Sequence, residues 1–396
     1  QYDAAGNRTR LTWPDGFYAT TDYDALNRPT TLKEQGSVPL AGYAYDDLSR
    51  RRTVTLGNGT TTTLDYDNQS ALSGLSHAFV GGSGNVGFSF TRNQAGEIVG
   101  HSWNNDRYLW TATHLNQTYA ANGLNQYTAV GSRTLTYDAR ANLTGDGPWT
   151  YTYDSDNRLR TARSTQLNAT LDYDPIGRLR QTTFNAEWAL IYNGSMDIPI
   201  VVPLSTPVTR TTRLLYDGSD LIAEYDGAAP DTVQRRHVHG PGIDEPLVTY
   251  AGSGTGNKTW LYSDHQGSVV AQAGASGANT AIDAYGPFGE TDPAAGTRFG
   301  YTGQRYLAPL GLYDYKARFY SPTLGRFLQT DPIGYRDDNN LYAYVGNNPV
   351  NRRDPWGLSR QEAALLASCT MCDRPWQTLS DFGNGFIGNP GQGTAH

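Results

Sequence analysis

The sequence predicts an all-β fold, and three observations support this prediction. The chain has 44 Gly and 20 Pro among 396 residues, which favours many short strands joined by tight turns. A Tyr-Asp motif recurs along the chain, and its first four tyrosines are 21, 22 and 21 residues apart. Charged residues make up 17% and aromatic residues 12%, a composition that indicates a folded core and argues against a disordered tail or a coiled coil.

Each copy of the motif consists of Tyr-Asp, a short turn and Arg, with the residues of a strand on either side. The Asp carboxylate can accept hydrogen bonds from the backbone amides of its own turn. The Tyr can bury its ring while its hydroxyl makes a hydrogen bond. We therefore expect structural roles for these residues, with glycan binding by exposed aromatic rings as the alternative. Clear copies begin at Tyr2, Tyr23, Tyr45, Tyr153 and Tyr173, and weaker copies at Tyr66, Tyr137 and Tyr216.

Between Thr183 and Arg213 the periodicity is lost, and PIVVPLSTPV carries three prolines. Because Pro inside a strand-like run indicates an edge or a loop, we expect an irregular crossing here. The chain opens in the middle of a repeat, so Gln1 is interpreted as the cut edge of a longer protein.

The net charge of −7 includes no basic stripe, which argues against nucleic-acid binding. No apolar run approaches the roughly 20 residues of a membrane span. Cys369 and Cys372 are the only cysteines, so no disulfide framework holds the repeats, and a single CxxC is interpreted as an ordinary thiol or disulfide pair. His237 and His239 would share a strand face, but neither they nor His265 have a third metal ligand at a recognisable spacing. No cofactor or metal site is predicted.

Two Asp-Pro pairs, at Asp331 and Asp354, lie 23 positions apart. The residue before Pro is extended, so both carboxylates lie on stiff backbone. The LYAYV stretch between them is predicted to be a strand, and NNP at Asn347 a turn that brings the aspartates within reach. Two close carboxylates share a proton, so one can act as acid and the other as base. Taken alone, such turns are more often caps than catalysts.

After Leu358 the sequence SRQEAALLASC predicts a helix, with Ser359 as its N-cap and Glu362 completing a capping box. Residues 359–396 are too few for most catalytic domains.

The repeats resemble the YD repeat of the Rhs family, which is shared with teneurins and the C components of bacterial toxin complexes. The resemblance is most specific from Phe299 to Leu358, in FGYTGQRYLAPLGLYDYKARFYSPTLGRFLQTDPIG and the DPWGL that follows. It implies a spiralling β-sheet that forms a cocoon-like shell, or part of one, around a toxin. In such a shell the Thr183–Arg213 segment would be an internal plug or a seam.

The resemblance also implies a single-turnover aspartyl autoprotease that cuts between Leu358 and Ser359, with no multiple-turnover activity. Asp331 and Asp354 would be the catalytic pair. Arg318 would orient a carboxylate or stabilise the oxyanion. The sequence departs from the family pattern at Tyr335 and Asp337-Asp338, where the acidic residues would raise the pKa values of the pair.

These expectations give three parts: a repeat shell at 1–298, an autoprotease region at 299–358, and the start of a variable effector or docking tail at 359–396. The implied partners are the chain's own effector segment, a secretion-system spike or adaptor, an immunity protein and glycans. The implied source is bacterial, and the chain would be secreted or displayed on the cell surface as part of a longer protein. The alternatives are a non-catalytic adhesion protein that binds carbohydrate and a polysaccharide-acting enzyme, since acid pairs are common in glycosidases.

Overall fold

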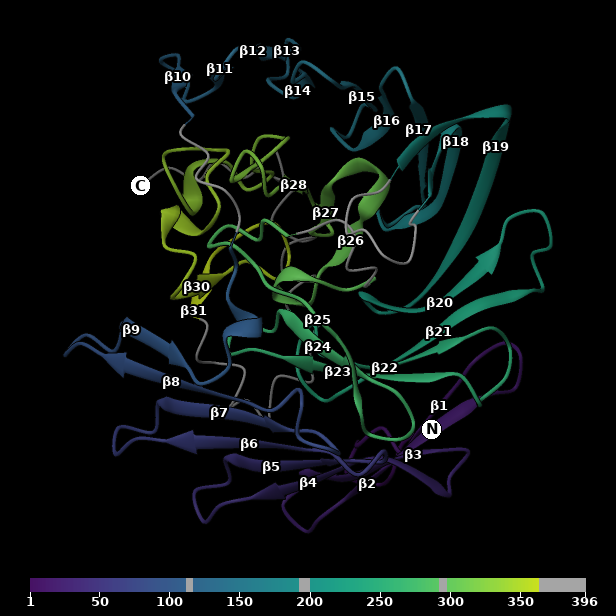
Figure 1. Cartoon of the computed structure of the whole chain (residues 1–396), viewed down its shortest axis with the longest axis vertical. Coiled ribbons are helices and arrows are strands. Elements are labelled where there is room, and N and C mark those ends of the chain that lie inside the picture. Colours follow the sequence, from purple (N-terminus) through teal and green to yellow (C-terminus); the bar gives the residue numbers. More distant parts are fainter. Residues whose placement is uncertain (112–116, 192–199, 292–297, 363–396) are drawn as a thin grey trace, which may run out of the picture.

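The computed structural model describes residues 1–111, 117–191, 200–291 and 298–362, and these residues form strands, turns and short 3₁₀ segments without an α-helix. Within each sheet, every strand pairs antiparallel with its neighbours in the sequence, so each sheet is a continuous meander. Figure 1 shows the strands following one another around a ring, with the C-terminal strands inside it. This arrangement confirms the all-β prediction.

The first sheet has nine strands: β1 (Arg10–Thr12), β2 (Tyr18–Tyr23), β3 (Pro29–Glu34), β4 (Val38–Tyr45), β5 (Arg51–Leu56), β6 (Thr61–Tyr66), β7 (Leu72–Ala78), β8 (Val86–Arg92) and β9 (Ile98–Trp103). After a 3₁₀ turn at Asp106–Tyr108 comes a three-stranded sheet: β10 (Tyr119–Ala121), β11 (Tyr127–Val130) and β12 (Arg133–Thr134).

The largest sheet has thirteen strands: β13 (Thr136–Tyr137), β14 (Leu143–Gly145), β15 (Thr150–Tyr153), β16 (Leu159–Arg163), β17 (Leu167–Tyr173), β18 (Leu179–Ile191), β19 (Ile200–Asp217), β20 (Asp220–Asp226), β21 (Val233–His239), β22 (Pro246–Ala251), β23 (Lys258–Ser263), β24 (Val269–Ala273) and β25 (Asn279–Ile282). The inner strands are β26 (Arg305–Leu307), β27 (Leu312–Asp314), β28 (Phe319–Ser321) and β29 (Arg326–Phe327) in one sheet, and β30 (Arg352–Arg353) with β31 (Gln361–Glu362) in another.

The Tyr-Asp motif closes the hairpins in the way its residues predict. In the copy at Tyr23, Asp24 Oδ1 accepts hydrogen bonds from the amides of Leu26 and Arg28 at 2.9 and 3.0 Å. Its Oδ2 receives the guanidinium of Arg28 at 2.7 Å. Asn27 occupies the left-handed region with φ of 59°, which Asn adopts readily. The Asp and Arg thus stabilise the turn itself.

The tyrosines link each turn to the one before it. The Tyr45 hydroxyl donates to the carbonyl of Pro29 at 2.8 Å, and the guanidinium of Arg28 lies 4.5 Å from the centre of the Tyr45 ring. The same pair of contacts joins Arg158 to Tyr173, whose hydroxyl bonds the carbonyl of Leu159. Arginine over an aromatic ring is favourable, so repetition of this contact stacks the turns along one rim.

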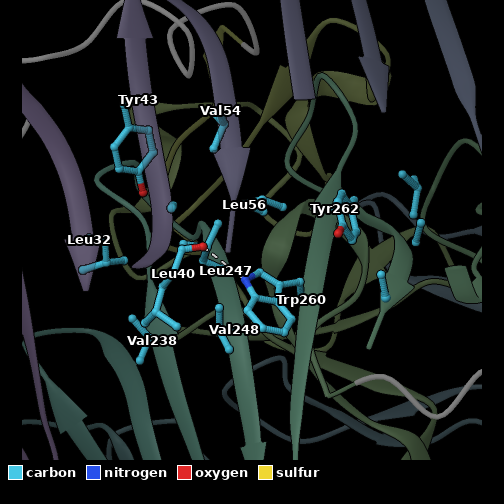
Figure 2. Close-up of a cluster of buried hydrophobic side chains, with 14 of the residues drawn as sticks. Leu32, Leu40, Tyr43, Val54, Leu56, Val238, Leu247, Val248, Trp260 and Tyr262 are labelled. Carbon is cyan, nitrogen blue, oxygen red and sulfur yellow. Dashed lines mark hydrogen bonds between the residues drawn. The ribbon is translucent and has the colours of Figure 1, made fainter. Parts of the chain in front are cut away.

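The first sheet packs face to face against strands β20–β25 of the largest sheet. The packed layer includes Leu40 and Val54 from one side and Val248 and Trp260 from the other, as Figure 2 shows. Trp260 Nε1 donates to the carbonyl of Leu40 at 3.1 Å, so the indole is both buried and satisfied. Burial of these apolar faces holds the two sides of the ring together.

The prediction of an irregular crossing between Thr183 and Arg213 is wrong for the described residues. Strands β18 and β19 form a long hairpin that continues the sheet, with one register shift between Ala186 and Trp188. Among the described pairings, β20 bonds only the Thr212–Asp217 end of β19, so the stretch that contains Pro203 is an edge. A missing Pro amide is tolerated at an edge, which is why the prolines do not end the strand.

No helix among the described residues is long and apolar enough to cross a membrane.

Candidate active site

The 299–358 region, which carries the two Asp-Pro pairs, is hydrogen-bonded to the thirteen-stranded sheet at two separate strands, β14 and β24. The Leu143 amide donates to the carbonyl of Leu328 at 2.9 Å, and the Val269 amide to that of Gly300 at 3.0 Å. Beneath the segment is a layer of fully buried aromatic rings: Tyr301, Tyr313, Tyr315, Tyr320, Phe327 and Tyr344. This closely packed layer gives the site a rigid support.

Both predicted aspartates cap their own turns. Asp331 Oδ1 accepts the amide of Ile333 at 2.9 Å. Asp354 Oδ1 accepts the amides of Trp356, Leu358 and Ser359 at 3.3, 3.0 and 3.2 Å. The structural role expected of Asp-Pro turns is therefore present, and it leaves the Oδ2 atom of each carboxylate for other contacts.

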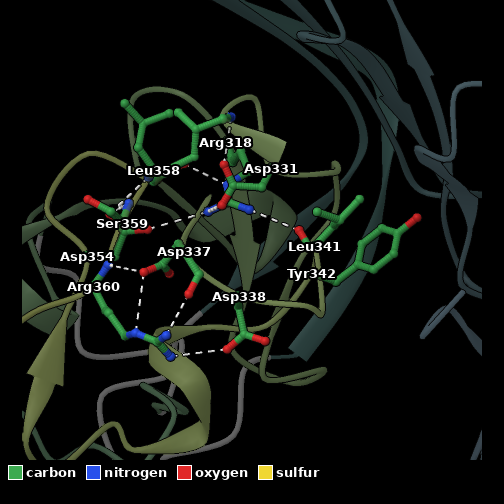
Figure 3. Close-up of polar contacts among 12 residues, drawn as sticks. Arg318, Asp331, Asp337, Asp338, Leu341, Tyr342, Asp354, Leu358, Ser359 and Arg360 are labelled. Carbon is green, nitrogen blue, oxygen red and sulfur yellow. Dashed lines mark hydrogen bonds and ion pairs between the residues drawn. The ribbon is translucent and has the colours of Figure 1, made fainter. Parts of the chain in front are cut away.

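Arg318 brings the two aspartates together. Its Nη2 lies 2.9 Å from Asp331 Oδ2 and 3.5 Å from Asp354 Oδ2, and its side chain is 1% exposed. Nη1 donates to the carbonyl of Leu341 at 3.1 Å, and the guanidinium stacks 3.7 Å from the centre of the Phe327 ring. Figure 3 shows both carboxylates pointing at this one guanidinium.

Burial sets the electrostatics of this group. It raises the pKa of Asp354 to about 6, against the opposing charge of Arg318 and the three amide hydrogen bonds. It also raises the pKa of Asp331, where Arg318 again opposes the shift and the charge of Asp337 adds to it. The charge of Asp337 thus raises the pKa of Asp331, as expected for an acidic residue at this position. A carboxyl with a pKa near neutrality can donate and accept a proton at physiological pH.

The expected cleavage site, Leu358–Ser359, lies at the end of the turn that Asp354 caps. Gly357 has φ of 65°, and a Cβ atom there would lie 2.6 Å from the carbonyl oxygen of Tyr315, so only glycine fits. Arg318 Nε donates to the carbonyl of Gly357 at 2.6 Å. Arg318 thus contacts both carboxylates and the backbone that precedes the expected cleavage site.

The prediction of a strand at LYAYV is wrong. This stretch makes one isolated bridge, Arg326 to Ala343, and then a 3₁₀ turn at Val345–Asn347. Tyr342 and Tyr344 are both buried, but against different neighbours, Tyr137 and Tyr320. The predicted turn at Asn347 is present, with φ of 59°.

The tail does not begin as a helix. The Ser359 amide bonds Asp354, and Gln361–Glu362 forms β31, which pairs with β30 through Arg352↔Glu362 and Arg353↔Gln361. Strand pairing and the Asp354 turn engage the amides that the capping box would have used. The rest of the predicted helix, and Cys369 with Cys372, lie outside the described residues.

His237 and His239 share a face of β21, and both rings lie against Phe299. His237 Nε2 is 3.2 Å from Glu224 Oε1, and Arg298 Nε bonds the same carboxylate at 2.7 Å. Burial acts to raise the pKa of Glu224, but His237 and Arg298 outweigh it and lower the pKa. His265 lies elsewhere, near the carbonyl of Val350. Within the described part of the chain, no group of three His, Cys, Asp or Glu side chains is placed to hold a metal ion.

Sequence reasoning missed the contacts that fix the Asp354 turn from outside. Lys316 Nζ donates to the carbonyl of Pro355 at 2.6 Å and pairs with Asp244 at 2.7 Å. Gln304 Nε2 bonds Asp244 at 2.7 Å. These residues come from three distant segments, so no spacing in the sequence indicates the group, although Lys316 is one of only three lysines in the chain.

Comparisons with known proteins agree with this fold. No family model matches the chain. The chain is 30% identical over 249 residues to the tRNA3(Ser)-specific nuclease WapA of Bacillus spizizenii, covering 60% of this chain and 10% of that protein. It is 35% identical over 140 residues to toxin subunit YenC1 of Yersinia entomophaga, covering 31% of this chain and 14% of YenC1. It therefore corresponds to a small part of these relatives.

Among solved structures, the crystal structure of TcdB2-TccC3 matches with a TM-score of 0.64 and 17% identity, covering 90% of this chain and 22% of that one. TcdB2-TccC3 without its hypervariable C-terminal region matches with a TM-score of 0.65 and 17% identity, covering 90% of this chain and 21% of that one. At this identity the likeness shows the fold alone.

Consecutive antiparallel strands joined by stacked Tyr-Asp turns define a YD-repeat β-shell. The sequence is similar to parts of WapA and YenC1, and the fold is similar to that of TcdB2-TccC3. These similarities agree with the resemblance of the Tyr-Asp repeats to the Rhs/YD-repeat family.

Proposed function

We propose that the chain is the C-terminal part of an Rhs-type toxin carrier that cuts itself between Leu358 and Ser359. The observation that carries this proposal is the bridge from Arg318 Nη2 to Asp331 and Asp354. It pairs two carboxyls with raised pKa values, and one of them, Asp354, accepts the amides of Leu358 and Ser359. The tethered substrate needs no binding step, so proximity accounts for much of the rate.

Cleavage requires a water to attack the carbonyl carbon of Leu358 while a base takes one of its protons. The nitrogen of Ser359 must then gain a proton before the bond to Leu358 breaks, which leaves a carboxyl on Leu358 and an amine on Ser359. The Ser359 amide donates to Asp354 Oδ1 at 3.2 Å, so this carboxyl contacts the nitrogen that must leave. We assign Asp354 as the proton donor to the leaving nitrogen and Asp331 as the base that activates water.

The proposed organisation follows the three parts of the sequence: a repeat shell at 1–298, the autoprotease at 299–358, and the start of an effector or docking tail at 359–396. A relative named as a tRNA nuclease, and a solved relative described with a hypervariable C-terminal region, support a carrier whose last segment varies. Under this proposal the full protein is exported, and its partners are the effector, a secretion-system spike or adaptor, and an immunity protein.

Intact mass spectrometry of the purified chain tests the proposal. The wild type should yield fragments 1–358 and 359–396, whereas Asp331→Asn and Asp354→Asn should each remain whole, because an amide can neither accept the proton nor donate it as a carboxyl does. Asp283→Asn is the matched control: Asp283 is also buried with a pKa raised to about 6, but it lies outside the site. This control should be cut.

A wild type that stays whole at every pH, or an Asp354→Asn chain that is still cut after Leu358, would contradict the proposal. An uncut wild type would favour the alternative of a non-catalytic adhesion protein.

A further inference from the structure

Arg360, the second residue after the expected cleavage site, is held by two acidic side chains. Its Nη1 lies 3.1 Å from Asp338 Oδ2, and its Nε lies 3.3 Å from Asp337 Oδ1. Nη2 also donates to the backbone carbonyl of Asp337 at 2.5 Å. Figure 3 shows the guanidinium between the two aspartates, below the Asp354 turn.

All three nitrogens of the guanidinium make contacts. Its nitrogens reach two carboxylates and one carbonyl, and the Arg360 amide adds a contact of 3.4 Å to Asp337 Oδ1. Asp338 Oδ1 accepts the amide of Asn340 at 2.9 Å, which fixes the orientation of the Asp338 carboxylate. Gly346 lies directly beside the guanidinium, and its φ of 62° is in the left-handed region that favours glycine. A planar fork of donors matches this set better than a lysine ammonium does.

The acidic pair, Asp337 and Asp338, lies a few residues after Asp331 in the chain. Asp337 follows the 3₁₀ turn Gly334–Arg336, which itself follows the Asp331 turn. Its charge contributes to the raised pKa of Asp331. On the other side, the Ser359 amide bonds Asp354. The residues after the cleavage site are therefore held at both the Asp354 turn and the acidic pair.

We propose that Asp337 and Asp338 form a guanidinium-binding subsite that takes Arg360 and positions the segment after the cleavage site against Asp354. The inference rests on the proposed self-cleavage and deepens it: the protease selects an arginine at the second position after the cut bond. Asp337 and Asp338 are positioning residues in this scheme, since they hold the substrate segment without touching the reacting atoms.

Cleavage kinetics test the subsite. Each chain is produced in denaturant and then refolded, and self-cleavage is followed from that moment. The variants Arg360→Gln and Asp337→Asn/Asp338→Asn should be cut roughly tenfold or more slowly than the wild type, because the segment after the cut bond is no longer fixed. Arg360→Lys should be intermediate, since lysine keeps the charge but not the fork. Asp47→Asn, which removes a carboxylate from an exposed repeat turn, should be cut at the wild-type rate.

Thermal melting of the same variants separates positioning from folding. If Arg360→Gln melts as the wild type does and is cut as fast, the subsite is overturned while self-cleavage stands. If Arg360→Gln and Arg360→Lys are slowed equally, guanidinium recognition is overturned.

A second measurement does not depend on self-cleavage. In the Asp354→Asn background, trypsin should cut after Arg360 slowly, because trypsin must bind the guanidinium that the two aspartates hold. Adding Asp337→Asn/Asp338→Asn should speed this cut roughly tenfold, while the cut after exposed Arg140 stays constant as an internal reference. Equal rates in both backgrounds would refute the subsite. A wild type that never cuts itself would instead refute the proposed function, and the trypsin result would still decide whether the subsite exists.

Discussion

Arg318 Nε donates a 2.6 Å hydrogen bond to the carbonyl oxygen of Gly357, the residue before Leu358. The same guanidinium contacts Asp331 and Asp354 through Nη2. One buried side chain therefore fixes both carboxylates and the backbone that leads into the proposed cleavage site. Under the proposed self-cleavage its role is positional, because it holds the acid pair against the backbone that leads to the bond.

Replacing Arg318 with Ala should slow self-cleavage roughly 100-fold, because a misplacement of reacting groups by about 1 Å costs a factor of this order. It should also destabilise the uncut Asp354→Asn chain by about 3 to 5 kcal/mol, because the buried Asp331 carboxylate loses its counter-charge. Cleavage time courses and urea unfolding in the Asp354→Asn background measure the two effects. Arg52→Ala is the control, since Arg52 forms an ion pair in which both side chains are 51% exposed. Cleavage of Arg318→Ala at the control rate would exclude the positional role.

Self-cleavage should become slower as the pH rises above 6. Burial raises the pKa of Asp354 to about 6, and the proposed mechanism needs this carboxyl protonated. The protonated fraction then falls up to about tenfold for each further pH unit. Refolding the denatured chain into buffers between pH 6 and pH 8 and following the fragments by mass spectrometry gives the profile. A rate that is constant or increasing over this range would contradict the assignment of Asp354 as the acid.

The repeat turns should contribute stability through their aspartates. Asp174 Oδ1 accepts the amides of Ile176 and Arg178 at 3.1 and 2.9 Å, and its Oδ2 pairs with Arg178 at 2.7 Å. We expect Asp174→Ala to lower the free energy of unfolding by about 1 to 3 kcal/mol, since amides lose their acceptor. Asp174→Asn keeps an oxygen for the amides and should cost less. Urea unfolding compares the two, and equal losses would mean that the ion pair, not the turn bonds, stabilises the hairpin.

Acid should weaken the packed sheets through their buried histidines. Burial lowers the pKa of His77 to about 4 and that of His265 to about 4, from an ordinary 6.5. A histidine whose pKa is lowered by folding contributes stability above pH 6.5, and this contribution is lost as the pH falls from 6.5 through 4, because the unfolded chain binds the proton more readily. Each site accounts for about 3 kcal/mol at most. His77→Gln should reduce the loss of stability between pH 6.5 and pH 4 in urea titrations. An unchanged loss would show that protonation of His77 does not contribute to the acid sensitivity.

The repeat architecture was open to prediction because its determinants are local. Asp24 and Arg28 bond within one turn, and within each sheet the strands pair with their sequence neighbours. The pattern of each copy therefore contains most of the contacts that shape it. Local contacts also explain why the Asp-Pro turns at Asp331 and Asp354 were foreseen as caps. The errors lie where long-range contacts compete, as in LYAYV, whose tyrosines are buried by different neighbours, and at Ser359, whose amide bonds Asp354 in place of a helix cap.

The sequence by itself determined the all-β class, the turns, and the identity of Arg318, Asp331 and Asp354 as residues of interest through their resemblance to a family. Only the tertiary structure decided that one guanidinium lies between both carboxylates and that Arg360 lies between Asp337 and Asp338. The physical reason is that turn contacts span four or five residues, whereas the site depends on burial. Burial raises the pKa values of the aspartates, and it exists only once segments far apart in the chain have packed together.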